Sequence, residues 1–147
     1  MNERHLSFTA IRELLNEYEI ENGLLYLRIK PILLDVIADD WEREPRFRCK
    51  FTYTSIVIKS SKWNPSEFGF SRPETSKKNE ERELEFRPVK EVINIYETEG
   101  ENIILLAYVL DKIVAKNELD SEGVPFLHFV ERNFIEVVPR PDRTRRD

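Results

Sequence analysis

The feature that most constrains this chain is a long alternating segment, Leu24 to Ser60, which predicts a β-hairpin. In its second half, apolar side chains occupy every other position at Phe47, Cys49, Phe51 and Tyr53. Cations or threonines fill most positions between them. Neighbouring side chains of a strand point to opposite faces, so this period of two indicates a strand with one buried face.

The charges of the hairpin predict its pairing register. If Phe51 faces Leu34, Cys49 meets Val36 on the core face. On the reverse face, pairs of opposite charge then meet, Asp35 with Lys50 and Asp39 with Arg46, each contributing roughly 0.2–1 kcal/mol. Farther from the tip, this register places four apolar residues on the reverse face, Leu27, Ile29, Ile56 and Ile58. Pro31 predicts a bulge or an edge position where the character changes.

The segment from Ser7 to Glu21 predicts an amphipathic helix that covers this apolar half-face. Its apolar residues recur at steps of three and four, at Phe8, Ile11, Leu14, Leu15 and Tyr18. Ser7 or Thr9 can cap its start, and Asn22-Gly23 can end it.

The rest of the chain alternates between loop and strand patterns. Residues 61–83 predict a long loop, mobile at about 72–83 where most residues are polar. Strand patterns follow at 84–86, 92–96 and 124–138. The apolar run 103–114 favours a buried strand, with a helix as the alternative. We expect no internal repeat, and residues 140–147 predict a flexible basic tail.

These elements predict an α+β fold in one globular domain, residues 1–139. The N-terminal helix packs on a strongly coiled, mostly antiparallel sheet of about five strands. The sheet is either open or closed as a small barrel of the oligonucleotide-binding kind.

The composition narrows the classes of protein to which the chain can belong. Its 147 residues suit one domain, and 40% are hydrophobic and 35% charged. No apolar run approaches the ~20 residues that span a membrane, so we expect a soluble protein without membrane contact. A single cysteine, Cys49, predicts a reducing, cytoplasmic location. Four glycines beside this many charges resemble thermophile composition.

No residues combine into a recognisable catalytic, cofactor or metal set. His128 has no second histidine or cysteine nearby in sequence, whereas zinc takes about four ligands. Cys49 lies among aromatic residues that do not stabilise a thiolate. We therefore expect a protein that is not an enzyme and holds no cofactor. The alternative is an enzyme or small-ligand barrel with Asp35, Asp39 or His128 in a carboxylate-containing pocket.

Cations and aromatic residues around the long loop form the strongest candidate for a functional surface. Binders of single-stranded nucleic acid combine a cationic groove with aromatic stacking platforms, and aromatic residues also anchor protein partners. This candidate binding surface comprises Arg46, Arg48, Lys62, Trp63, Phe68, Phe70 and Arg72. Two interpretations compete with it: Asp35 and Asp39 neutralise the strand cations, and the loop aromatics close the core.

The expected function is that of a non-catalytic binding module. It acts through protein–protein or single-stranded nucleic-acid contacts, and a second copy of the chain is one such protein partner. The net charge of −5 argues against a chain coated for nucleic acid.

Overall fold

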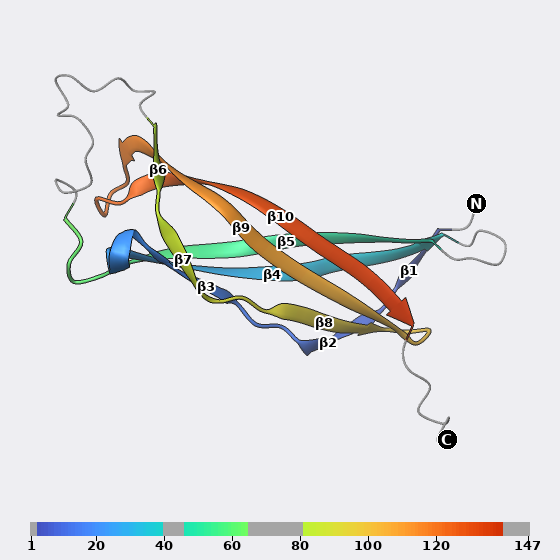
Figure 1. Ribbon diagram of the computed structural model, residues 1–147. Coiled ribbons are helices and arrows are strands. Elements are labelled where there is room, and N and C mark those ends of the chain that lie inside the picture. The colour runs from blue at the N-terminus through green and yellow to red at the C-terminus, as the bar shows by residue number, and fades with distance from the viewer. Residues whose placement is uncertain (1–2, 40–45, 65–80, 140–147) are drawn as a thin grey trace.

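The computed structural model describes residues 3–39, 46–64 and 81–139, and these residues are almost entirely β-strand (Figure 1). The one helical element among them is a 3-10 turn, η1, at Glu21–Gly23. The strands are β1 Glu3–Leu6, β2 Phe8–Arg12, β3 Asn16–Ile20, β4 Leu25–Asp39, β5 Arg46–Lys59, β6 Glu81–Leu84, β7 Phe86–Lys90, β8 Ile93–Thr98, β9 Asn102–Leu119 and β10 Pro125–Pro139.

The strands form two antiparallel five-stranded sheets, each built around one long strand. In sheet A, β4 pairs with β5 along one edge and with β1 and β3 along the other, and β7 lies beside β3. In sheet B, β9 pairs with β10 along one edge and with β6 and β8 along the other, and β2 lies beside β8. The hairpins β4–β5 and β9–β10 run the length of the molecule (Figure 1). Among the described residues, neither sheet closes into a barrel.

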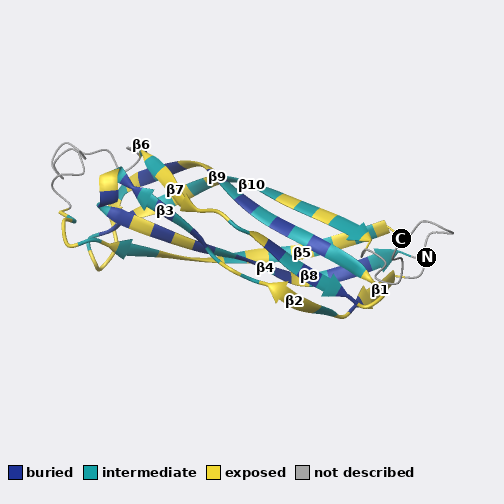
Figure 2. Ribbon diagram, turned by 60° about the horizontal axis from the view of Figure 1, so that its bottom comes forward, coloured by how far each residue is buried: buried dark blue, intermediate teal, exposed yellow. Residues whose placement is uncertain are grey.

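The apolar core lies between the two sheets. Alternate side chains of β4 and β9 are buried, including Leu27 and Ile29 from sheet A and Leu106 and Tyr108 from sheet B (Figure 2). Strands β2 and β7 tie the sheets together, because each leaves the sheet of its sequence neighbours and joins the other one. The fold is therefore an all-β sandwich whose halves exchange a strand.

The expectation of no internal repeat is wrong, because β1–β5 and β6–β10 have the same order and the same pairings. Even the β-bulges recur: Ile11 and Val89 are skipped in the exchanged strands, and Leu34 and Asp111 in the long strands. The segments 3–21 and 81–99 align without a gap. Their identical pairs are Glu3/Glu81, Arg4/Arg82, Leu6/Leu84, Phe8/Phe86, Glu13/Glu91, Asn16/Asn94, Tyr18/Tyr96, Glu19/Glu97 and Glu21/Glu99.

Two buried asparagines hold the points where the chain crosses between sheets. The Asn94 side-chain oxygen accepts the Leu14 N–H at 2.8 Å, and its amide nitrogen donates to the Pro31 carbonyl at 2.9 Å. Asn16 repeats this arrangement in the other half, accepting the Val92 N–H and donating to the Tyr108 carbonyl, both at 2.9 Å. Each amide thus replaces the ladder bonds that the chain loses when it changes sheets.

A pair of tyrosine–glutamate hydrogen bonds reinforces these crossings. The Tyr96 hydroxyl donates to Glu13 at 2.7 Å, and the Tyr18 hydroxyl donates to Glu91 at 3.0 Å. Burial and the glutamate partner raise the pKa of Tyr96 to about 12, and the same causes raise the pKa of Tyr18. Both hydroxyls are therefore held as neutral donors.

The predicted α+β fold is wrong, because no helix forms between Ser7 and Glu21. Ile11 and Leu14 are 56% and 40% exposed, whereas Asn16, Tyr18 and Ile20 are buried at a strand period. The chain changes sheets at 13–15, so the alternation of inward and outward side chains in β2 is out of phase with that in β3. Together the apolar residues of the two strands recur at steps of three and four, which resembles the spacing of a helix. The Asn22-Gly23 stop signal instead turns β3 into β4, with φ of 56° and 89°.

The predicted hairpin register is correct at its tip and wrong beyond it. Val36 pairs with Cys49, Asp35 with Lys50 and Asp39 with Arg46. The bulge falls at Leu34 and not at Pro31, so Phe51 pairs with Leu33 and every later pair shifts by one residue. Leu27 and Ile29 consequently lie in the core, while Ile56 stays 58% exposed with no helix above it.

The other strand predictions are confirmed at 103–114, which lies in β9, and at 125–138, which lies in β10, while Val124 precedes β10. Strands also form at 84–86, where Glu85 separates β6 from β7, and at 93–96 within β8, while Val92 precedes that strand. The end of the predicted mobile segment, Glu81 to Glu83, is strand β6. Residues 72–80 and the predicted tail, 140–147, lie outside the described residues.

We expect Asn94→Ala to lower the free energy of unfolding by about 1–3 kcal/mol or more, because it strands buried backbone groups of Leu14 and Pro31. Asn16→Ala should cost a similar amount, since it occupies the equivalent position. Chemical denaturation would measure both, with the exposed Thr52→Ala as a control expected within about 0.5 kcal/mol. A neutral result for both asparagines would contradict their role at the crossings.

Stability should fall as pH rises from about 10 towards 12. An unfolded tyrosine ionises near pH 10, while Tyr96 in the fold stays neutral up to about 12. The raised pKa therefore contributes stability that is present below about pH 10 and lost above it. Denaturation from neutral pH to about pH 12 should show a smaller loss for Tyr96→Phe than for the wild-type chain.

Candidate interaction surface

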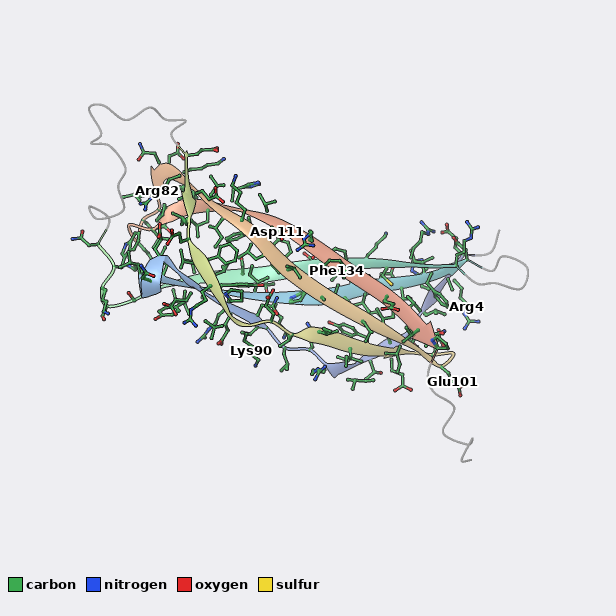
Figure 3. All side chains as sticks on the ribbon, viewed as in Figure 1. Arg4, Arg82, Lys90, Glu101, Asp111 and Phe134 are labelled. Atoms are coloured by element: carbon green, nitrogen blue, oxygen red, sulfur yellow. The ribbon has the colours of Figure 1, made fainter. Side chains whose placement is uncertain are left out.

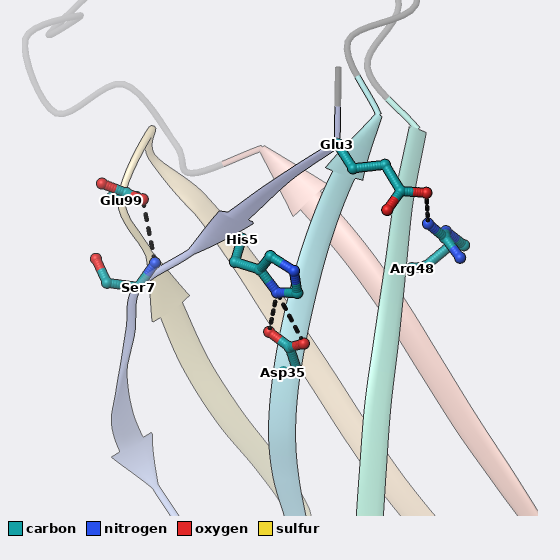
Figure 4. Close-up of polar contacts among 6 residues, drawn as sticks. All are labelled: Glu3, His5, Ser7, Asp35, Arg48 and Glu99. Atoms are coloured by element: carbon teal, nitrogen blue, oxygen red, sulfur yellow. Dashed lines mark hydrogen bonds and ion pairs between the residues drawn. The ribbon is translucent and has the colours of Figure 1, made fainter. Parts of the chain in front are cut away.

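The structure separates the residues of the predicted basic and aromatic surface. Arg46 and Arg48 lie at one end of β5, and Lys62 and Trp63 follow its other end, roughly 40 Å away at the usual rise of a strand. Arg48 binds Glu3 at 2.6 Å (Figure 4). It also lies 3.6 Å from Asp39. Phe68, Phe70 and Arg72 lie outside the described residues.

Trp63 packs against the apolar core and is not a free surface aromatic residue. Its indole N–H donates to the Gly123 carbonyl at 3.1 Å, and its ring packs on the core cluster of Tyr18 and Tyr108. Nearby, Lys59 donates to the Glu122 carbonyl at 2.9 Å, so the turn after β5 rests on the turn between β9 and β10. Lys62 is exposed beside this contact.

The residues of the predicted carboxylate pocket do not come together. Asp35 accepts a hydrogen bond from His5 at 2.9 Å, which lowers the pKa of its carboxyl (Figure 4). His128 lies on the other sheet, sheet B, where it pairs with Val114. Cys49 is not an activated nucleophile, because burial raises the pKa of its thiol. Within the described ranges no group of three or more histidine, cysteine or acidic residues could hold a metal ion.

The outer face of sheet B carries an apolar patch that sequence reasoning missed. Buried Ile104, Leu106 and Tyr108 point inward from β9, so the residues between them point out. The register places β8 residues on one side of these and β10 residues on the other, with Ile93 and Phe134 48% and 51% exposed. We define the sheet B patch as Ile93, Ile95, Ile103, Leu105, Ala107, Val109, Phe134 and Val138. Ile93 and Phe134 are exposed, and the other six are half-buried.

The equivalent positions of sheet A are charged. Glu17, Arg28 and Lys30 stand where the patch has Ile95, Leu105 and Ala107. On sheet A these charges pair, Arg28 with Glu17 at 3.6 Å and Lys30 with Glu13 at 3.3 Å. The two halves have the same strand arrangement, and sheet A carries charges at these positions. The fold therefore does not require the residues of the sheet B patch to be apolar.

Charged residues border the patch on β8, β9 and β10: Glu97 pairs with Ile103, Glu136 with Leu105 and Arg132 with Val109. Arg132 donates through Nε to Asp111 at 2.8 Å, and its guanidinium lies 5.7 Å from the centre of the Phe134 ring. Asp111 and Phe134 are labelled on the β9–β10 hairpin in Figure 3. The Asp111 carboxylate raises the pKa of Arg132. The sequence signal for the patch was the uninterrupted apolar run of β9, which does not itself say which face is covered.

Searches against protein-family models, curated proteins and solved structures find no match to this chain. In the part of the chain that the structure describes, no helix is long and apolar enough to cross a membrane.

Two neighbouring substitutions on β9 should have opposite effects. Leu105→Arg reproduces the residue that sheet A carries at Arg28, so we expect a change in unfolding free energy below about 1 kcal/mol. Leu106→Arg would bury an unpaired cation and should abolish cooperative folding. Denaturant melts and circular dichroism would test both, and unfolding by Leu105→Arg would show that the patch is structural.

Proposed function

We propose that this protein is a non-catalytic module that binds a partner protein through the sheet B patch. The observation that carries the proposal is the replacement of Glu17, Arg28 and Lys30 by Ile95, Leu105 and Ala107 in the second half. Exposed apolar residues gathered in one place are typical of binding surfaces, whereas single ones are not.

The size and chemistry of the patch indicate the kind of partner. Strand rise and spacing make it roughly 20 Å by 14 Å, on the order of 300 Å², well below the ~800 Å² that a standard interface buries on each partner. It therefore suits a short apolar segment. Ala107 lies between Ile93 and Phe134, whereas Glu136 stands beside Leu105. A charge placed over Ala107 would be desolvated among apolar side chains, so we expect the segment to be apolar where it covers this row.

The charges support a protein partner over single-stranded nucleic acid. Arginines of both sheets are held in ion pairs, among them Arg28, Arg48 and Arg87. A cationic groove that tracks phosphates needs cations available to them.

Site-specific photo-crosslinking tests the proposal. A photoreactive residue at position 105 of the full chain should yield a discrete adduct with another protein in a lysate of its source cells. Position 28, the equivalent site on sheet A, should not. Unlabelled wild-type chain should compete for the adduct, and the Leu105→Arg variant should not. Equal adducts from positions 105 and 28 would contradict the proposal that the sheet B patch is the binding site. In a separate experiment, binding of a labelled single-stranded oligonucleotide at low salt would favour the nucleic-acid alternative.

A further inference from the structure

Strand β10 offers a long free edge. It pairs with β9 along one side, and within the described residues no strand pairs with its other side. Such an edge is a template for another strand, and proteins protect edges with cations, prolines or bulges. β10 has proline only at its two ends, Pro125 and Pro139, and carries no lysine.

The equivalent edge in the first half is protected. The outward residues of β5 near the hairpin tip are Arg46, Arg48 and Lys50, and Lys59 closes the other end. β5 contains no acidic residue, so an antiparallel pair of two β5 strands would leave these cations without a carboxylate partner on the facing strand. Comparing the halves therefore singles out β10, because its one cation, Arg132, is accompanied by acidic residues of the same strand that could pair with it in a second copy.

The outward residues of β10 are self-complementary. After Phe126 and His128 they run Val130, Arg132, Phe134, Glu136 and Val138, and these five are symmetric about Phe134 except for opposite charges at its two flanks. In an antiparallel pair centred on Phe134, Arg132 of each copy faces Glu136 of the other, and Val130 faces Val138. We propose that two copies of this chain associate edge to edge through β10 in this register.

Other registers lack this match. Centring the pair on Arg132 or on Glu136 sets like charges face to face, which destabilises a cross-strand pair. Centring it on Asn133 or Ile135 sets each charge against an apolar side chain. In the Phe134 register the inward residues bring no like charges together, because Glu131 faces Val137.

The local geometry prepares Arg132 for this contact. Its Nε bond to Asp111 uses one of the five guanidinium donors, and its position over the Phe134 ring keeps it beside the proposed two-fold axis. Arg132 is 60% exposed, so the outward side of the group is open to a second carboxylate.

This inference goes beyond the proposed partner binding, since it concerns the edge of sheet B and not its face. If two copies join at β10, sheet B of one copy and sheet B of the other form one continuous sheet. The sheet B patches of the two copies then meet across the paired Phe134 side chains. The dimer would thus present about twice the patch area of one copy.

Charge exchange tests the register on the full chain, by sedimentation velocity over a concentration series. The wild-type chain, 17.6 kDa, should reach twice that mass as concentration rises. Arg132→Glu and Glu136→Arg should each weaken self-association by about tenfold or more. An equimolar mixture of these two variants, or the double variant R132E/E136R, should restore it. Lys50→Glu on β5 is the matched control and should leave association unchanged.

Disulfide trapping gives an independent readout that does not depend on affinity alone. In a Cys49→Ser background, Phe134→Cys should form an intermolecular disulfide under mild oxidation, since directly opposed residues have Cβ atoms about 4.5–5.5 Å apart. Thr54→Cys, the equivalent site on β5, should not. A wild-type chain that stays monomeric at about 100 μM, or a dimer indifferent to both charge variants, would overturn the proposal. Neither result would alter the crosslinking test of the patch.

Discussion

The structure depends on the hydrogen bonds of two buried amides, Asn16 and Asn94. A strand that leaves one sheet for the other interrupts its ladder, and the freed backbone groups would be costly to bury without partners. Each asparagine binds backbone groups at a crossing and on the long strand of the opposite sheet. One side chain thus sets both where the chain changes sheets and how the two sheets pack.

The two halves keep the same buried asparagine and tyrosine at their crossings and differ on their outer faces. The motif Glu-x-x-Asn-x-Tyr occurs in both halves, at Glu13 to Tyr18 and at Glu91 to Tyr96. On the outer faces, the paired charges of sheet A give way to aliphatic residues on sheet B. Since both faces rest on the same backbone, this divergence separates what holds the fold from what is available for binding.

Much of the strand content could be predicted, because alternation is a local property of the chain. The tip of the β4–β5 hairpin followed from charge pairing across near neighbours, and β9 and β10 followed from their apolar character. The prediction failed between Ser7 and Glu21, where the chain crosses between sheets and its alternation changes phase. Arguments from the spacing of apolar residues have no means to detect such a change. The surface built on Arg46 and Trp63 failed to assemble because those residues flank opposite ends of one strand.

The sequence by itself determined the alternating strands, the register at the hairpin tip and a duplicated motif that an internal alignment would have revealed. The tertiary structure decided which sheet each short strand joins, where the bulge at Leu34 shifts the register, and which face of β9 is exposed. These outcomes rest on contacts between residues far apart in the chain, such as Asn94 with Leu14 and Pro31. Such contacts leave no periodic signal, because the partner of each group is defined only once both sheets are in place.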